Sequence, residues 1–176
     1  MKKIIDTVAI ILASGKGQRF DKSKLKQYQI INDKAVIYHS ANIFLKNPNI
    51  HKVIVVINKH HTKQASKHLK GINAENIIYG GETRQDSVYY ALSYIEKYKP
   101  KNVLIHDAVR PNIQNNMINL ILEKLAIYKA VIPVINISDS VKELSANFVN
   151  KHIQRDKLVL AQTPQGFRYN DILDKH

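Results

Sequence analysis

Short apolar runs alternate along the chain with segments whose hydrophobic residues recur at helical spacing. The runs are rich in Val, Ile, Leu and Ala and predict buried strands at residues 7–13, 53–57, 77–79, 103–106 and 130–134. Apolar residues three and four positions apart predict helices at residues 35–46, 60–70, 88–95 and 118–125. This alternation predicts an α/β fold that is Rossmann-like and doubly wound, with a mostly parallel sheet and helices on both faces.

The pattern loosens after residue 135. Residues 136–158 are polar with scattered strand-forming side chains, which predicts a protruding β-arm or hairpin. The apolar pattern resumes at residues 159–161, and a helix is expected to start within residues 169–175. The chain of 176 residues is 44% apolar and contains no repeat or linker, so we expect a single domain over residues 1–176.

A glycine-rich, basic loop follows the first predicted strand. Gly15 and Gly17 let the backbone approach a bulky anionic ligand, because a Cβ atom would clash there. Positive charge gathers around them at Lys16, Arg19, Lys22, Lys24 and Lys26. Such a loop at the end of a strand favours a nucleoside triphosphate, and a plain turn is the alternative.

Two well-known phosphate-binding loops do not match this stretch. A Walker A loop places Ser or Thr directly after its lysine, whereas Gly17 follows Lys16. The dinucleotide fingerprint has a third glycine where this chain has Phe20, and an acidic residue after the second strand where it has Asn58. The glycine loop therefore belongs to neither class.

Further polar clusters lie where other strands are predicted to end. They are Gly80 to Ser87, His106 to Pro111, and a group formed by Asp139 to Lys142, Arg155 and Gln162 to Gln165. Because ligands bind at the carboxyl ends of strands in open α/β sheets, we expect these clusters to share one edge with the glycine loop. Each cluster alone is also compatible with a capped turn, in which Thr83 or Ser87 caps a helix.

The formal net charge of +13 raises the question of nucleic-acid binding. Of the 27 basic residues five are arginine, and the lysines are spread along the chain without an aromatic platform for stacked bases. We therefore predict no nucleic-acid partner. Most of the arginines fall in or beside the polar clusters, where a planar guanidinium suits phosphate: Arg19, Arg84, Arg110 and Arg155.

Protein-held metal has little support in the sequence. There is no cysteine, which excludes a disulfide framework and a thiolate metal site and fits a cytoplasmic location. His60 and His61 are adjacent and have no carboxylate at ligand spacing, so we expect a solvated pair. His106 is expected to be a hydrogen-bonded structural residue rather than a base.

No apolar run is long enough to span a membrane, so we expect no membrane partner.

The motifs together resemble those of one enzyme family. Gly80-Gly-Glu-Thr-Arg-Gln-Asp-Ser87, His106-Asp-Ala-Val-Arg-Pro111 and Gln162-Thr-Pro-Gln165 are similar in order and spacing to the 2-C-methyl-D-erythritol 4-phosphate cytidylyltransferases, from residue 7 to about residue 173. The resemblance implies a nucleotidyltransferase that transfers CMP from CTP to 2-C-methyl-D-erythritol 4-phosphate and releases pyrophosphate, in the non-mevalonate route to isoprenoid precursors. It also implies a homodimer that exchanges contacts through an arm of residues 136–158.

The same resemblance implies roles for individual residues. Catalysis would rest on Arg19, Lys26 and Asp107. The nucleotide would contact Ala13, Ser14, Gly15, Gly17, Gly81, Glu82, Ser87, Asp107 and Ala108, and Arg84 would brace the loop. The acceptor would contact Arg110, Ser140, Arg155 and Thr163. Mg²⁺ would be held mainly by the phosphates of CTP, with Asp107 as the candidate protein ligand.

The sequence departs from the family's pattern at three positions and at its end. Leu25 replaces a proline, Val109 an alanine and Ser140 a threonine. The family's C-terminal segment, whose lysine binds the acceptor phosphate, has no counterpart in these residues. Two other functions therefore stay open: CMP transfer to another polyol phosphate such as ribitol 5-phosphate, and a truncated, catalytically inactive remnant that binds nucleotide.

Overall fold

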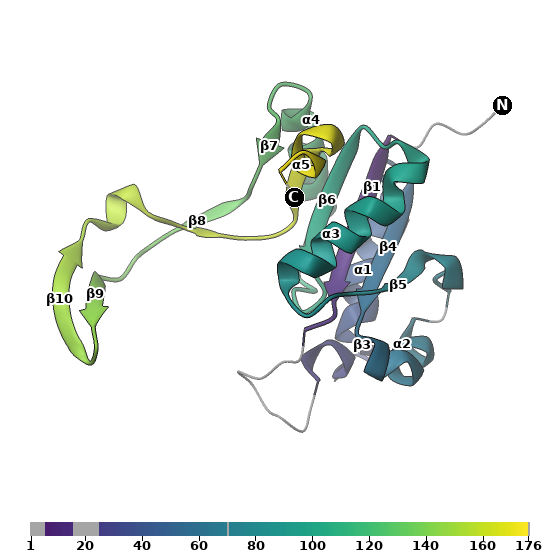
Figure 1. Cartoon of the computed structure of the whole chain (residues 1–176), viewed down its shortest axis with the longest axis horizontal. Helices are drawn as coiled ribbons and strands as arrows, with labels where there is room; N and C mark the ends of the chain where they lie inside the picture. Colours follow the sequence, from purple (N-terminus) through teal and green to yellow (C-terminus); the bar gives the residue numbers. More distant parts are fainter. Residues whose placement is uncertain (1–5, 16–24, 70, 176) are drawn as a thin grey trace.

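A mixed sheet forms the centre of the molecule in the computed structural model, which describes residues 6–15, 25–69 and 71–175 (Figure 1). Its strand order among these residues is β5-β4-β1-β6-β12-β7. The strands are β1 (Thr7–Ala13), β4 (Lys52–Ile57), β5 (Ile77–Tyr79), β6 (Asn102–Asp107), β7 (Ala130–Val131) and β12 (Gln165–Arg168). The first four pair in parallel, and β12 runs antiparallel to both β6 and β7. The predicted mostly parallel, doubly wound sheet is confirmed.

Helices cover both faces of this sheet. They are α1 (Val36–Lys46), α2 (Thr62–His68), α3 (Arg84–Ile95), α4 (Asn115–Leu125) and α5 (Tyr169–Leu173). Single 3₁₀ turns occupy η1 (Lys26–Tyr28), η2 (Lys59–His61), η3 (Ala74–Asn76), η4 (Glu96–Tyr98) and η5 (Arg155–Lys157). Buried residues of α1, α2 and α4 belong to one hydrophobic core, whereas those of α3 and α5 belong to the other.

The alternation of side chains along β1 separates the two cores. Ala9 and Ile11 point into the core under α1, α2 and α4, while Val8 and Ile10 point into the core under α3 and α5. β1 is buried on both faces because helices cover each side of the sheet at its centre, which explains its continuous apolar run. Each fully buried Ile or Val contributes roughly 1.5–3 kcal/mol. The centre of the sheet is therefore a rigid support for the loop that follows β1.

Some elements differ from the prediction. The apolar run at 130–134 is not one strand, because Pro133 has no N–H group for a sheet and separates β7 from β8 (Val134–Asn136). β8 leaves the central sheet and pairs with β11 (Val159–Ala161). A small hairpin of β2 (Ile30–Ile31) and β3 (Lys34–Ala35) was not predicted. Its turn residues Asn32 and Asp33 have φ of 46° and 63°, which suits a tight hairpin.

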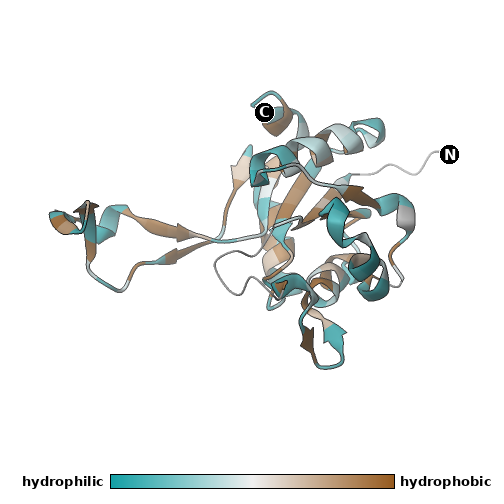
Figure 2. Ribbon diagram, turned by 60° about the horizontal axis from the view of Figure 1, so that its bottom comes forward, coloured by the Kyte–Doolittle hydropathy of each residue, from teal (hydrophilic) through white to brown (hydrophobic). Residues whose placement is uncertain are grey.

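The predicted β-arm is confirmed and extends away from the body of the molecule (Figure 1). Its outer part is an antiparallel hairpin of β9 (Val141–Ser145) and β10 (Phe148–Ile153), and its stem is the β8–β11 pair. Figure 2 shows hydrophobic positions along both parts. The exposed apolar residues include Val134, Ile135, Leu144, Phe148, Val149, Val159 and Leu160. Within the described residues, no helix has the length and apolar character needed to cross a membrane.

Candidate functional site

Loops from three parallel strands and the start of β12 meet at one edge of the sheet. Ser14 follows β1, and its Oγ lies 2.8 Å from the Oγ of Ser87, beyond β5. Asp107 ends β6, and its backbone N–H donates to the Thr163 Oγ1 at 3.4 Å. Thr163 reaches this edge because β12 is antiparallel, so the segment before β12 lies beside the carboxyl end of β6. The described part of the glycine loop, the cluster Gly80 to Ser87 (the second cluster) and the cluster His106 to Pro111 (the third) therefore lie together. Part of the fourth cluster, which holds Gln162 to Gln165, lies with them.

Two amide side chains hold the described part of the glycine loop. Gln27 is 3% exposed, and its Nε2 donates to the carbonyls of Ala13 at 3.0 Å and Gly15 at 3.2 Å. Asn58 donates from Nδ2 to the carbonyl of Ser14 at 3.4 Å. A Cβ atom added at Gly15 would have no neighbour within 4 Å among the residues that the structure describes, so no described side chain crowds this backbone. No local sequence pattern marks Gln27 or Asn58 as supports of the loop.

The remaining predicted residues of this loop are partly outside the described chain. Gly17 and Arg19 lie in residues 16–24, which the structure does not describe. Lys26 is described and opens η1, directly before Gln27. The Gln27 hydrogen bonds therefore connect the segment that carries Lys26 to the end of β1.

The second cluster is the N-terminus of α3. Thr83 caps the helix: its side chain accepts the Asp86 N–H at 3.0 Å, and the Asp86 carboxylate accepts the Thr83 N–H at 2.9 Å. These hydrogen bonds lower the pKa of Asp86. Ser87 is buried and donates to the Thr83 carbonyl at 2.9 Å while accepting the Gly81 N–H at 3.1 Å. The capping residue is therefore Thr83, and Ser87 ties the loop together.

Ser87 also sets the hydrogen-bond direction between the two glycine-containing loops. Its single hydroxyl hydrogen is used by the Thr83 carbonyl, so Ser14 must be the donor in the Ser14–Ser87 pair. The pair is packed tightly against Gly80, where a Cβ would lie 2.5 Å from the Ser87 Oγ. A larger residue at Gly80 would push the loops apart. Glu82 lies exposed in the same turn.

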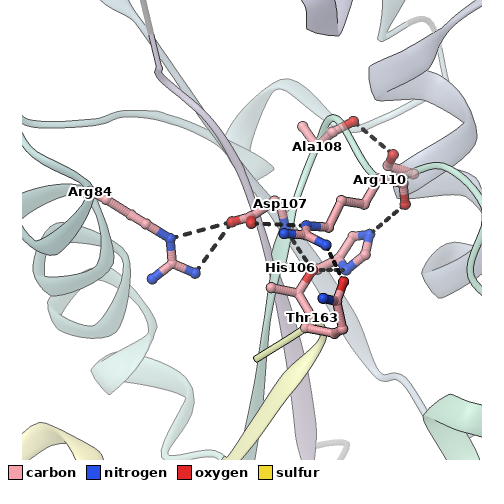
Figure 3. A network of polar contacts seen from close by, with 8 residues as sticks. Arg84, His106, Asp107, Ala108, Arg110 and Thr163 are labelled. Carbon is pink, nitrogen blue, oxygen red and sulfur yellow. Dashed lines mark hydrogen bonds and ion pairs between the residues drawn. The ribbon is translucent and has the colours of Figure 1, made fainter. Parts of the chain in front are cut away.

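The third cluster is organised by Asp107, whose carboxylate lies between two arginines (Figure 3). Arg84, the first residue of α3, donates from Nε and Nη2 to Oδ1, each at 3.3 Å. Arg110 donates from Nε to Oδ2 at 3.3 Å, and its Nη1 donates to Gln162. Two guanidinium groups around one carboxylate give this cluster a net positive charge, which favours an anionic ligand. The expected brace from Arg84 thus runs across the site to Asp107.

Ala108, the residue after Asp107, is fully buried. Its N–H donates to the Leu12 carbonyl at 2.9 Å, and its carbonyl accepts the Ser40 hydroxyl at 2.7 Å. Both backbone polar groups are therefore already paired within the chain. The nucleotide contact expected at Ala108 stays a prediction, and it would have to use the surface of this backbone rather than a free hydrogen-bonding group.

His106 lies directly beneath this cluster and is 0% exposed. Its Nε2 is 3.0 Å from the Arg110 carbonyl and its Nδ1 is 2.9 Å from the Thr163 hydroxyl. The ring packs against Phe44 of α1 at a centroid distance of 5.1 Å. Burial lowers the pKa of His106 to about 4, so the ring is neutral near pH 7. The prediction of a hydrogen-bonded residue is confirmed.

The fourth cluster is divided between two regions, which corrects the expectation that all of it lies at strand ends of the sheet. Gln162 and Thr163 lie at the sheet edge, whereas Ser140 and Arg155 belong to the arm. The cause is the departure of the chain from the sheet at Pro133 and its return through β11. In the arm, Arg155 donates from Nη1 to the Ser138 carbonyl and lines a hollow with Asn136, Ile137, Ser138, Asp156, Leu158 and Val159.

The described residues contain no group of three or more His, Cys, Asp or Glu side chains that could hold a metal ion. Both oxygens of Asp107 already accept from arginine. His60 is exposed, but the prediction of a solvated pair is wrong for His61. The Nδ1 of His61 is buried without a hydrogen-bond partner among the described residues, and its ring packs edge-on against Tyr28 at 6.5 Å.

A doubly wound sheet with polar loops and a cationic cluster at its carboxyl edge is typical of α/β proteins that bind phosphorylated ligands, a class that includes the nucleotidyltransferases. The crystal structure of the Francisella tularensis 2-C-methyl-D-erythritol 4-phosphate cytidylyltransferase has the same fold. It superposes with a TM-score of 0.78 at 31% sequence identity, over 96% of this chain and 75% of that one. The family model IspD, 2-C-methyl-D-erythritol 4-phosphate cytidylyltransferase, matches residues 7–176. The chain belongs to this family.

Two curated relatives differ in how much of their length the chain matches. The bifunctional enzyme IspD/IspF of Paramagnetospirillum magneticum is 35% identical over 170 residues, which are 97% of this chain and 44% of the relative. The 2-C-methyl-D-erythritol 4-phosphate cytidylyltransferase of Clostridium beijerinckii is 36% identical over 172 residues, which are 96% of this chain and 75% of the relative. The chain thus spans less than half of the bifunctional relative and three quarters of the monofunctional one.

Proposed function

We propose that the protein is a cytidylyltransferase that transfers CMP from CTP to 2-C-methyl-D-erythritol 4-phosphate and releases pyrophosphate, a step in isoprenoid precursor biosynthesis. The main structural support for this proposal is that the end of β1, the Arg84–Asp107–Arg110 cluster and Thr163 meet at one edge of the sheet. Family membership and the names of the relatives agree with this reaction. The location that we expect for it, the cytoplasm, is part of the proposal.

The proposed chemistry is an in-line displacement at phosphorus. A phosphate oxygen of the acceptor attacks the α-phosphorus of CTP, a new P–O bond forms, and the bond to the β-phosphate oxygen breaks to release pyrophosphate. The acceptor phosphate is already a nucleophile at neutral pH, so no histidine base is needed. Catalysis is then positioning and charge stabilisation, with Lys26 and Arg19 beside the α-phosphoryl oxygens.

The nucleotide-binding role of the glycine loop rests on the space and support at Gly15. The open position above its backbone would admit a triphosphate, and Gln27 would keep the loop fixed while the ligand approaches. On this proposal Ala13, Ser14, Gly15, Gly17, Gly81, Glu82, Ser87, Asp107 and Ala108 surround the nucleotide. Ser87, whose buried hydroxyl forms a hydrogen bond with Ser14, would act by holding Ser14 in place beside the nucleotide.

Magnesium is expected to enter with CTP, bound mainly by phosphate oxygens. Mg²⁺ in nucleotide sites commonly uses one or two carboxylates together with phosphates and water. Asp107 fits as one such carboxylate, although each of its oxygens now accepts from an arginine. When bound, Mg²⁺ supplies Lewis-acid neutralisation of the phosphate charge. The protein's own contribution at this point is to hold Asp107 between Arg84 and Arg110.

The acceptor site is proposed to need two copies of the chain. Arg110 and Thr163 lie at the sheet edge, whereas Ser140 and Arg155 lie on the arm. The arm also exposes a run of apolar residues, with Leu144 at 65% and Phe148 at 78% exposure, which is typical of a surface that another protein covers. We infer a homodimer in which the arm packs against the second copy and brings Ser140 and Arg155 to its sheet edge.

Pyrophosphate release by the purified chain tests this function. We expect release with CTP, Mg²⁺ and 2-C-methyl-D-erythritol 4-phosphate, and little with ribitol 5-phosphate as the sole acceptor. Release with ribitol 5-phosphate alone would instead support the other polyol-phosphate specificity. A folded protein that binds CTP by calorimetry but is silent with both acceptors would refute the proposal and support a nucleotide-binding remnant.

A further inference from the structure

The buried imidazole of His106 connects two groups that face the proposed acceptor. Its Nε2 contacts the backbone carbonyl of Arg110 at 3.0 Å, and its Nδ1 contacts the hydroxyl of Thr163 at 2.9 Å. No reaction step proposed above uses this histidine. The ring itself cannot meet a substrate, because it is 0% exposed and packed against Phe44.

The partners of the ring determine where its hydrogen lies. A backbone carbonyl only accepts hydrogen bonds, so Nε2 must carry the hydrogen and donate it to the Arg110 carbonyl. A neutral imidazole has one N–H group, so Nδ1 is then an acceptor. Burial favours this neutral ring. The Thr163 hydroxyl is therefore the donor in its contact with Nδ1.

This assignment determines which further hydrogen bonds the Thr163 oxygen can make with a ligand. Its hydrogen is directed to His106, and one lone pair accepts the Asp107 N–H at 3.4 Å. A hydroxyl oxygen has two lone pairs, so one lone pair and no hydrogen remains for a ligand. Ligand phosphate at neutral pH is mostly a dianion and offers acceptors, which would repel that lone pair. A hydroxyl group of the polyol offers a hydrogen and matches it.

We propose that His106 is a positioning residue that turns the Thr163 hydroxyl inward, so that Thr163 recognises a hydroxyl group of the polyol rather than the acceptor phosphate. The same ring fixes the backbone at Arg110, whose side chain is held at the sheet edge by Asp107 and Gln162. The inference rests on the proposed function for the identity of the acceptor. The orientation of the Thr163 hydroxyl does not depend on that function.

The first experiment examines the ligand-free chain, without any turnover. Two-dimensional ¹H–¹⁵N spectra of histidine side chains distinguish a protonated from an unprotonated ring nitrogen. For His106, assigned by loss of its signals in His106→Gln, we expect a protonated Nε2 and an unprotonated Nδ1 at pH 7. A protonated Nδ1 would overturn the proposal, because Thr163 would then accept from the ring and keep its hydrogen for a ligand.

The second experiment uses variants that keep one end of the ring. His106→Asn keeps a polar group near the Nδ1 position, and His106→Gln keeps one near the Nε2 position. We expect His106→Gln to raise the KM for the polyol phosphate about fivefold to tenfold, the range for one lost neutral hydrogen bond, with the KM for CTP unchanged. His106→Asn should show a smaller rise, since it can still accept from Thr163.

A double-mutant cycle separates positioning from general support of the fold. Thr163→Val removes the hydroxyl at nearly the same shape, and Thr163→Ser keeps it. If His106 acts through Thr163, His106→Gln should add little to Thr163→Val, whereas it should still impair Thr163→Ser. Additive losses in the double variant, with equal rises in KM for both substrates, would show that His106 only supports the fold.

Inorganic phosphate distinguishes the two halves of the acceptor. As a competitive inhibitor against the polyol phosphate, it should bind Thr163→Val as well as it binds the unsubstituted chain, because Thr163 is assigned to a hydroxyl. Weaker inhibition in Thr163→Val would overturn that assignment. If the unsubstituted chain shows no turnover at all, the proposed function fails, and the spectra of the ligand-free chain alone decide the orientation of the Thr163 hydroxyl.

Discussion

The sheet edge and the arm differ in how their functional residues are held. At the sheet edge nearly every functional side chain has a partner within the same chain, as in the Ser14–Ser87 pair and the clamp of two arginines on Asp107. In the arm, Arg155 makes one local hydrogen bond and large apolar residues such as Phe148 are exposed. The difference agrees with the proposal that the described side chains at the sheet edge are held in place within one chain, whereas the arm packs against a second copy.

The largest expected effect is the loss of turnover in Lys26→Ala. This substitution removes a cation at the sheet edge and leaves the arm unchanged. We expect kcat to fall by two decades or more, because one preorganised cation beside the α-phosphoryl oxygens is removed. Pyrophosphate release is the measurement. Lys59→Ala, an exposed lysine after β4, is the matched control. Near-normal turnover in Lys26→Ala would exclude the proposed role of Lys26.

The next effect is the pH dependence of stability that His106 contributes to the sheet edge. Burial lowers the pKa of His106 from 6.5 to about 4, against smaller contributions from the Arg110 carbonyl and the Asp107 carboxylate, which raise it, and from the Arg110 guanidinium, which lowers it further. Below pH 6.5 the His106 ring becomes protonated in the unfolded chain, whereas in the folded chain it stays neutral until the pH approaches 4. The free energy of unfolding should therefore fall by about 3 kcal/mol as the pH drops from 6.5 to 4.

Urea denaturation at several pH values tests this dependence. His106→Gln cannot titrate, so its unfolding free energy should change less with pH than that of the unsubstituted chain. The difference in slope between the two proteins isolates His106 from the other acid-titrating groups. Equal slopes between pH 4 and 6.5 would mean that His106 is not buried as a neutral ring.

A substitution in the arm should change the assembly of the dimer rather than the stability of the fold. Phe148→Asp places a charge on its most exposed large apolar residue, and we expect the dimer dissociation constant to rise roughly thirtyfold. The unfolding of the body and the affinity for CTP should not change. Sedimentation velocity over a concentration series measures the shift, with Asn150→Asp as a control on the same strand. Unchanged assembly would place the dimer contact elsewhere.

The smallest effect compares two glycines that have opposite surroundings. A Cβ at Gly166 of β12 would lie 2.4 Å from the Ile121 Cγ2, so Gly166→Ala should destabilise the fold by about 1.5 kcal/mol through overpacking. A Cβ at Gly15 would have no neighbour within 4 Å in the described part of the chain, so Gly15→Ala should leave stability unchanged and raise the KM for CTP. Thermal unfolding and steady-state kinetics measure the two effects. A stability loss at Gly15 would contradict the ligand space assigned there.

The sequence predicts those parts of the fold that depend on local pattern. β1 was predictable because a strand buried on both faces must be continuously apolar. α4 was predictable because Ile118, Ile121 and Leu125 recur on one buried face. The meeting of Ser14, Ser87 and Asp107 at one edge of the sheet was predictable because polar clusters follow the ends of parallel strands.

Features that depend on contacts between distant segments could not be predicted. Asn58 was noted for lacking an acidic side chain, and its actual contact with the Ser14 carbonyl requires β4 and β1 to be neighbours. Gln27 carries no local signal for its hydrogen bonds to Ala13 and Gly15. The placement of Arg155 on the arm depends on the interruption at Pro133, which ends one strand pairing and begins another.

Mixing two inactive variants tests the central claim most directly, namely that one chain supplies the sheet edge and the other supplies the arm. Lys26→Ala has an intact arm, and Arg155→Ala has an intact sheet edge. Subunit exchange is verified by native mass spectrometry and makes about half of the dimers mixed. In each mixed dimer one of the two sites combines an intact sheet edge with an intact arm, so about one quarter of full activity should return. Exchange without any recovered pyrophosphate release would contradict the account.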